Sequence, residues 1–147
     1  MDPTMTADLP DGYEISTDPA RLDAELVHRW LSQDAYWALG RPRETQDLAI
    51  AGSLNFGVYD RTSGAQLGYA RVVTDGATFA WLCDVYIAPA ARGHGLGTAM
   101  VTAVRDHLAR YGLRYVLLAT ADAHALYAKV GFTPLVRPEK WMAMGDQ

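Results

Sequence analysis

The sequence is poor in the features that mark several large classes of protein. Cys83 is its single cysteine, so no disulfide can form within the chain and a reducing, cytoplasmic environment is expected. Acidic residues outnumber basic ones by 17 to 13, and a net charge of −4 argues against binding nucleic acid or an anionic membrane surface. No apolar run approaches the roughly 20 residues of a membrane-spanning helix. The opening Met-Asp-Pro-Thr-Met-Thr lacks the basic and apolar segments of a secretory signal.

What is present suits one globular domain. The chain has 147 residues, of which 50% are hydrophobic and 20% charged, which is enough to build a full core. Residues 1–12 contain Pro3, Pro10 and Gly12 and show no periodicity, so we expect a flexible N-terminal tail. Residues 13–147 are expected to form a single domain, because no linker or repeat interrupts them.

The spacing of apolar residues predicts helices around a meander of strands. Thr17-Asp18-Pro19 has the capping residue and the proline of a helix start, and Leu22, Leu26 and Trp30 follow at helical spacing. The other expected helices cover residues 44–51, 97–110 and 122–130; the expected strands cover 13–16, 55–60, 66–74, 78–87 and 115–119, with a closing pair at 132–136 and 140–144. This order predicts a mixed α/β or α+β sheet.

A glycine-rich loop follows the expected strand 78–87. It reads Arg92-Gly-His-Gly-Leu-Gly97 and opens the helix 97–110. Glycine has no Cβ, so the amides of such a loop converge, and the start of a helix favours an anion there. The spacing lacks both the Gly-x-Gly-x-x-Gly of a dinucleotide fold and the Gly-Lys-Ser/Thr of a nucleotide P-loop. It predicts a different phosphorylated ligand, with a purely structural turn as the alternative.

Two motifs resemble the GNAT superfamily of N-acetyltransferases. The stretch Arg92–Gly97 matches its Gln/Arg-x-x-Gly-x-Gly/Ala signature for acyl-CoA, and Val85-Tyr-Ile-x-Pro89 resembles its fourth strand. Ala123-His-Ala-Leu-Tyr-Ala-Lys-Val-Gly-Phe132 resembles its Ala-x-x-Leu-Tyr-x-x-x-Gly-Phe element, one helix and one strand later. The resemblance implies a mixed, mostly antiparallel sheet of six to seven strands flanked by about four helices. It also implies acetyl-CoA as the acetyl donor and an amine as the acceptor.

The resemblance assigns contacts with acetyl-CoA to the fourth strand and the loop. The main chain of Val85, Tyr86 and Ile87 is expected to pair with the pantetheine, and one of their amides to polarise the thioester carbonyl. Their side chains are expected to pack in the core. Loop amides are expected to bind the pyrophosphate, with a charge-assisted contact from Arg92. The whole expected set is Val85, Tyr86, Ile87, Arg92, Gly93, His94, Gly95, Leu96, Gly97, Thr98, Thr120 and Tyr127.

Tyr127 occupies the position of the family's general acid. A phenol near the sulfur can hydrogen-bond the departing thiolate and return a proton, because the pKa of a thiol is about 8.5 and that of tyrosine about 10. Taken without the resemblance, the residue reads equally as an aromatic side chain that packs helix 122–130 on the sheet.

The general base stays open at this level. Many relatives carry a glutamate one residue before Asp84, where this chain has Cys83. Asp84 is one candidate, although strand alternation predicts that it faces away from Cys83 and a structural hydrogen-bonding role is equally open. His124 is the other candidate, against a place on the helix surface. Asp122 is expected to cap its helix. A water relay, a self-deprotonating acceptor and, less favoured, covalent Cys83 complete the alternatives; no metal is expected.

The connection over residues 34–44 is expected to wall the acceptor site. Tyr36 and Trp37 are candidates to stack on a ligand, Arg41 or Arg43 to clamp a carboxylate, and Trp81 to join them. For any one of them, anchoring the loop or facing water is the alternative. The hypothesis is a small primary amine that carries an anionic group. A non-catalytic acyl-CoA sensor or interaction module, a protein N-acetyltransferase and an unrelated phosphate-binding domain remain alternatives, and a homodimer is considered because relatives often dimerise.

Overall fold

The structure is a computed structural model of the whole chain, and it describes residues 4–5 and 9–146. Within these residues one sheet carries six strands in the spatial order β1-β2-β3-β4-β5-β6. The strands are β1 (Thr4–Met5), β2 (Tyr13–Ser16), β3 (Leu54–Asp60), β4 (Gln66–Thr74), β5 (Phe79–Ile87) and β6 (Tyr115–Leu117). The helices are α1 (Ala24–Asp34), α2 (Arg43–Ala51), α3 (Leu96–Ala109) and α4 (His124–Val130), with short 3-10 turns at Pro19–Arg21, Pro89–Ala91 and Pro138–Lys140.

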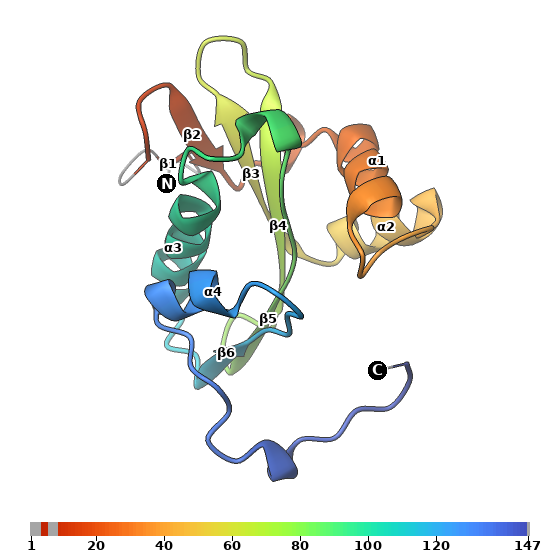
Figure 1. Cartoon of the computed structure of the whole chain (residues 1–147), viewed down its shortest axis with the longest axis vertical. Coiled ribbons are helices and arrows are strands. Elements are labelled where there is room, and N and C mark those ends of the chain that lie inside the picture. The colour runs from red at the N-terminus through yellow and green to blue at the C-terminus, as the bar shows by residue number, and fades with distance from the viewer. Residues whose placement is uncertain (1–3, 6–8, 147) are drawn as a thin grey trace.

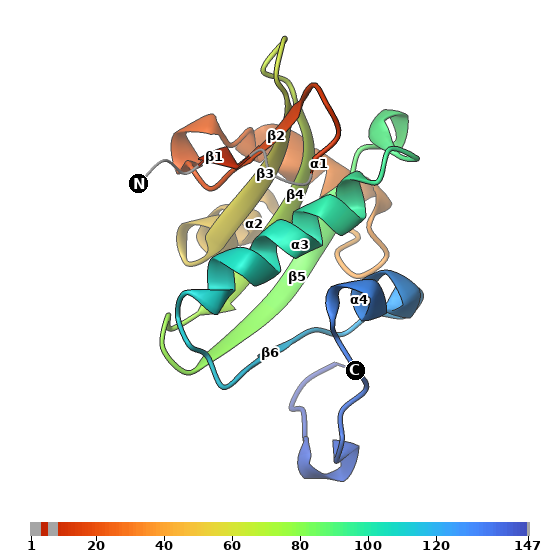
Figure 2. The same ribbon diagram turned by 90° about the vertical axis from the view of Figure 1, so that its left-hand side faces the viewer.

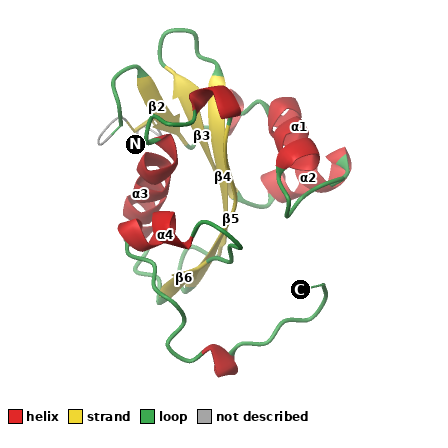
Figure 3. Ribbon diagram, viewed as in Figure 1, coloured by secondary structure: helices red, strands yellow, loops and turns green. Residues whose placement is uncertain are grey.

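Helices cover both faces of the sheet. Figure 1 shows α3 and α4 on one side and α1 and α2 on the other, and Figure 3 shows how much of the remaining chain is loop. The α3 face is apolar, because five residues of α3 are buried against the sheet: Leu96, Met100, Val101, Val104 and Leu108. The opposite face holds a smaller apolar cluster around Val27, Leu31 and Tyr69. This arrangement confirms the predicted mixed, mostly antiparallel sheet with four helices.

The sheet opens between its last two strands. β5 and β6 run parallel and pair only at Phe79–Trp81, whereas β5 continues to Ile87. Beyond Trp81 the chain from β6 diverges towards α4, as Figure 2 shows. One edge of the second half of β5 therefore lacks a strand partner among the described residues, although it lies inside the molecule.

A bulge interrupts β5 just before this open edge. Tyr69 pairs with Tyr86 and Arg71 with Cys83, so β5 has one residue more than β4 over this interval. Asp84 lies in the bulge at a φ of +52°, and it is the only described non-glycine residue with a positive φ. Such a φ is unfavourable for a side chain with a Cβ, so neighbouring contacts must hold Asp84 in place.

Three expectations about element boundaries need correction. The first long helix does not begin at Pro19: Asp18 caps only the 3-10 turn Pro19–Arg21, and Asp23 caps α1 by accepting from the amide of Leu26. The closing pair of strands at 132–136 and 140–144 does not form, and those residues run as loop around a 3-10 turn. Of the expected tail, residues 1–3 and 6–8 lie outside the described residues, and Thr4–Met5 pairs with β2.

Candidate active site

A cavity of about 500 Å³ lies where the sheet opens. Its walls come from four elements: the second half of β5, the loop before α3, the start of α4 and the connection after α1. The sequence-predicted residues that line it are Tyr36, Trp37, Val85, Tyr86, Ile87, Arg92, Gly93, Gly95, Leu96, Gly97, Thr98 and Tyr127. The structure thus brings most of the expected acetyl-CoA set to one hollow.

The glycine loop presents backbone donors to this cavity. Gly93 and Gly95 have φ of +87° and +75°, which only glycine adopts without strain, and open space surrounds the position of a Cβ at both. Gly95 is the N-cap of α3, and no side chain caps that helix. A Cβ on Gly97 would lie 3.3 Å from Cδ1 of Leu126, so glycine also permits the close approach of α4. The first turn of α3 therefore offers uncapped amides and a positive helix end to an anion.

Arg92 lies at the rim of the same cavity. Its Nε donates to the carbonyl oxygen of Ile87 at 2.9 Å, and its guanidinium lies 5.3 Å from the ring centre of Tyr86. The Tyr86 hydroxyl donates to Asp34 at 2.5 Å, and Arg92 approaches the same carboxylate at 3.6 Å. Burial, followed by the hydrogen bond to Asp34, raises the pKa of Tyr86 to about 12. Arg92 keeps about half of its side chain exposed and can reach an anion at the loop.

Tyr127 lies on α4 and faces the cavity. Its ring packs edge-on against Phe132 at 5.9 Å between centres, which fixes its direction. Burial, with a smaller contribution from Tyr36, raises the pKa of Tyr127 to about 12. The phenol is therefore fully protonated at neutral pH and is a hydrogen-bond donor throughout the physiological range.

Asp84 is the centre of a buried ionic cluster. Its carboxylate accepts from both terminal nitrogens of Arg41 at 2.8 and 3.3 Å and from Nε of Arg71 at 2.8 Å. Nε1 of Trp37 donates to the same group at 2.9 Å. Burial opposes the charge, but the hydrogen bonds and charges of the two arginines prevail and lower the pKa of Asp84. With its side chain 1% exposed, Asp84 is an anchored anion rather than a free proton acceptor.

The bulge also changes which residues share a face with Asp84. Arg71 pairs directly with Cys83 across the strands and also binds Asp84, so the two β5 side chains lie on the same face. The alternation argument, which placed them on opposite faces, was therefore wrong, because it assumed a regular strand. Burial raises the pKa of the Cys83 thiol to about 11, which leaves little thiolate at neutral pH.

The connection after α1 spans the cavity from β5 to α4. The Tyr36 hydroxyl accepts from the amide of Ala121 at 2.9 Å, ahead of α4. The neighbouring Trp37 ring lies edge-on to Tyr36 at 5.0 Å and is tied to Asp84. The two aromatics are about half exposed, so they wall the cavity and still offer surface to a ligand.

Other predicted residues lie elsewhere or act differently. Arg43 pairs with Asp47 on the surface of α2, and His124 is exposed and does not line the cavity. His94 and Trp81 also lie outside the cavity lining. Asp122 lines the cavity but is not the N-cap of α4, which corrects that expectation. Thr120 takes the capping role instead, because its hydroxyl accepts from the amides of Asp122 and Ala123.

Arg71, Gln46 and Asp34 are site residues that sequence reasoning missed. Gln46 accepts from Arg41 at 2.9 Å and is fully buried, and Arg71 supplies half of the guanidinium pair on Asp84. A charged residue in the otherwise apolar run Tyr69–Val73 was the available signal for Arg71. The described ranges contain no cluster of three metal-ligating side chains, and none of their helices is long and apolar enough to span a bilayer.

The site has the parts of an enzyme that uses an acyl-CoA: uncapped amides for a phosphate, an open strand edge for an extended chain and a protonated phenol beside it. Residues 24–132 match the model of the acetyltransferase (GNAT) family. This match covers more than half of the chain, and the chain belongs to that family of acetyltransferases.

Individual relatives agree with this assignment. The protein named "Putative acetyltransferase FG08082" from Gibberella zeae is 34% identical over 135 residues, which cover 80% of this chain and 76% of that protein. The crystal structure of a GNAT-family protein from Xanthomonas campestris (xcc2953) is 44% identical and has a TM-score of 0.87, over 94% of this chain and 95% of that one. Rv2747 from Mycobacterium tuberculosis, solved with CoA, is 19% identical with a TM-score of 0.69, over 82% and 72% of the two chains. This last likeness concerns the fold.

Proposed function

We propose that the protein is an acetyl-CoA-dependent N-acetyltransferase that transfers acetyl directly to the primary amine of a small molecule. Residues 13–147 would form one acyltransferase domain, and the single cysteine supports a cytoplasmic location. The observation that carries the proposal is the conjunction of the uncapped α3 amides, the open edge of β5 and Tyr127 around one cavity.

These residues fit acetyl-CoA part by part. The amides at Leu96–Thr98 and the free part of Arg92 suit a pyrophosphate, because charge-assisted donors converge there. The unpaired edge at Val85–Ile87 suits the pantetheine, whose amides can pair with a strand as an added strand does. A CoA complex exists for the structural neighbour Rv2747, which has the same fold.

The chemical step needs two groups of this chain. A β5 amide beside the bulge would hold the oxygen of the thioester carbonyl as negative charge develops on attack by the amine. The C–S bond then breaks, and Tyr127 donates its hydrogen bond to the sulfur. The pKa of about 12 for Tyr127 exceeds that of a thiol, about 8.5, so the phenol keeps its proton until the nitrogen supplies another. The amine proton thus ends on the sulfur through Tyr127.

The acceptor is proposed to lose its ammonium proton to water before attack. Asp84 is committed to Arg41 and Arg71 and has a lowered pKa, and His124 lies outside the cavity lining. Asp84 is then a positioning residue that holds Trp37 at the cavity wall. On this proposal the acid limb of kcat/KM follows the pKa of the acceptor amine and shifts when the amine is changed. An acid limb that stays fixed across amines of different pKa would assign the base to the protein.

An anionic group on the acceptor remains part of the proposal, on altered grounds. Two guanidiniums share one carboxylate in the Arg41–Asp84–Arg71 cluster, so it keeps one positive charge next to Trp37. Arg43 is instead held by Asp47 on the surface. The Arg41→Ala variant should raise the KM for an anionic amine severalfold more than for a neutral one, whereas Arg43→Ala should leave both unchanged. Equal effects on both amines in Arg41→Ala would remove the anionic requirement.

The experiment for the whole proposal is release of CoA thiol in the presence of acetyl-CoA and a panel of small amines, amino acids and peptides. Turnover with a small amine supports the proposal, and turnover only with peptides favours a protein N-acetyltransferase. Saturable binding of acetyl-CoA without turnover on any amine would favour the non-catalytic sensor.

A further inference from the structure

The C-terminal arm, residues 133–146, leaves apolar side chains almost wholly in solvent. Val136 is 93% exposed, Met142 is 97% exposed and Met144 is as exposed as in an extended peptide. Leu135 and Trp141 are each 41% exposed. Figure 1 shows the arm running away from the rest of the molecule to the C-terminus. A cluster of exposed apolar residues in one segment is typical of a surface that contacts a partner.

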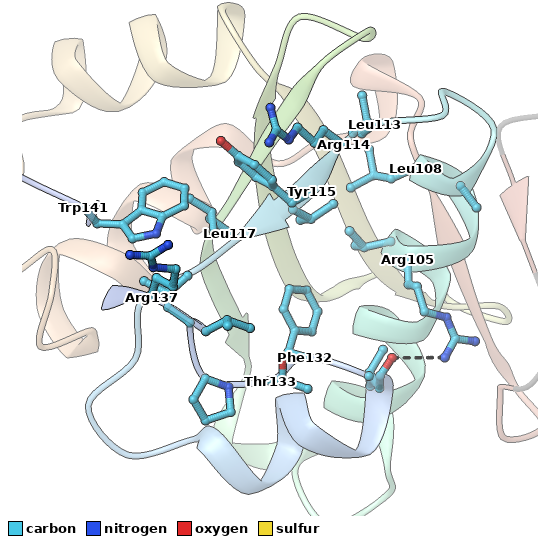
Figure 4. Close-up of a pocket in the computed structure, with 18 of the residues that line it drawn as sticks. Arg105, Leu108, Leu113, Arg114, Tyr115, Leu117, Phe132, Thr133, Arg137 and Trp141 are labelled. Carbon is cyan, nitrogen blue, oxygen red and sulfur yellow. Dashed lines mark hydrogen bonds between the residues drawn. The ribbon is translucent and has the colours of Figure 1, made fainter. Parts of the chain in front are cut away.

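A groove of about 940 Å³ lies at the base of this arm. It is bounded by α3, by β6 and by the arm itself, and Figure 4 shows Phe132 pointing into it between Arg105 and Tyr115. The ring of Trp141 lies 5.5 Å from that of Tyr115 and closes one end. β6 is the last strand of the sheet, and no described strand pairs with its outer edge. The groove thus combines apolar walls with an unpaired strand edge.

The arm is poorly suited to fill the groove of its own chain as a hairpin. Pro134 lacks the amide that a strand at 132–136 would need for pairing, and Pro138 fixes the turn between the two halves. Arg137 and Trp141, which flank the 3-10 turn, both have extended backbone, so residues 142–146 are directed outward from Trp141. These prolines account for the missing closing pair of strands.

We propose that two copies of this chain exchange their arms, so that residues 142–145 of each copy dock in the groove of the other along the outer edge of β6. The run Trp141-Met-Ala-Met144 is apolar on both sides of an extended chain, as suits a strand covered on both faces. A twofold exchange uses both arms and both grooves and leaves neither open, which closes the assembly as a dimer. The inference does not rest on the proposed function.

The test is the molar mass of the full-length protein by light scattering after size exclusion, at micromolar concentration. The wild type is expected to be a dimer, and the variant Met142→Asp/Met144→Asp a monomer, because charged side chains would be buried in the exchanged arm. Neither methionine is packed within one copy, so the melting of the monomeric variant still reports a folded domain. The matched control is Leu48→Asp, at a residue 75% exposed on α2, which should stay dimeric.

Complementation separates exchange from any other dimer. Tyr115→Glu alters the groove and leaves the arm intact, and it should be monomeric alone. Mixed with Met142→Asp/Met144→Asp, it should form a heterodimer, in which an intact arm meets an intact groove. A monomeric wild type, a dimer that survives the double substitution, loss of the dimer in Leu48→Asp, or no heterodimer on mixing would each overturn the proposal.

Discussion

The two sides of the cavity are built by different means. On the α3 side the binding groups are backbone amides, exposed by glycines at positive φ and backed by an apolar core. On the α1–α2 side the groups are side chains, and the central one, Asp84, is held by three neighbours through a buried charge cluster. Backbone geometry serves a ligand part that is common to a whole family, whereas side-chain clusters can differ from one family member to the next.

This contrast predicts different responses to substitution. Changes on the α3 side should weaken acetyl-CoA binding with ordinary effects on stability. Changes in the Asp84 cluster should alter stability and acceptor binding and leave the affinity for acetyl-CoA nearly unchanged.

Asp84→Asn tests the buried cluster and should have the largest effect. It leaves Arg41 and Arg71 without a charged partner in a buried site, and breaking such a pair costs about 3 kcal/mol. Urea unfolding followed by circular dichroism measures the loss. The control Asp106→Asn, in an exposed pair with Arg105, should change stability by less than about 0.5 kcal/mol.

The same variant has a defined pH dependence. The pKa of Asp84 is lowered in the folded state, so its stabilising contribution is fully present above its unfolded pKa of 3.8. The contribution is lost as pH falls through the folded pKa. The difference between wild type and Asp84→Asn should therefore be constant from about pH 6 to 8 and shrink below pH 4. A difference that persists unchanged into acid would assign the effect to packing.

Tyr127→Phe tests the chemical step. Removing the donor to the sulfur should lower kcat about 100-fold, as is common for loss of a general acid, and should leave the Kd for acetyl-CoA within about twofold. Thiol release and calorimetry measure the two quantities. Tyr111→Phe, on α3 and outside the cavity lining, is the matched control and should retain full turnover. Retained turnover in Tyr127→Phe would remove the proposed role.

Gly95→Ala tests the backbone side. At a φ of +75° the added Cβ costs about 1 kcal/mol of strain, and relaxation of the loop should weaken acetyl-CoA binding about tenfold. Gly64→Ala introduces a Cβ at a φ of +77° in the β3–β4 turn, so it should cost similar stability without affecting binding. Equal affinities in the two variants would show that the loop geometry is unrelated to the ligand.

The smallest expected effect is in the alkaline pH profile. Tyr127 has its pKa raised to about 12 by burial, so it remains a donor, and kcat should stay flat from about pH 8.5 to 10.5 where the fold is stable. A fall in kcat with an apparent pKa near 9 that is absent in Tyr127→Phe would contradict the raised pKa.

Much of the α3 side could be predicted from sequence. The spacing Arg92–Gly97 and the Ala123–Phe132 element fixed its place, and Gln66–Thr74 was predicted to the residue. The cluster on the other side could not, because the bulge at Asp84 depends on the pairing of β4 with β5. That bulge turned Asp84 towards Arg71, 13 residues away, and towards Arg41, 43 residues away. Local periodicity carries no signal for contacts at such separations.

The α1 boundary and the C-terminal arm failed for other reasons. Asp18 and Asp23 are both good caps, and only the second is followed by a helix, since the chain between them must cross to the sheet through Gln66. The apolar alternation at 140–144 is that of a strand, yet no partner strand is available to it within one copy.

Calorimetric titration of the purified protein with acetyl-CoA is the most direct test of the central claim, that the α3 amides and the β5 edge form an acyl-CoA site. The account predicts micromolar binding of acetyl-CoA, at least tenfold tighter than NAD or ATP, because only acetyl-CoA has a pantetheine to pair with Val85–Ile87. No binding, or equal binding of all three ligands, would contradict it.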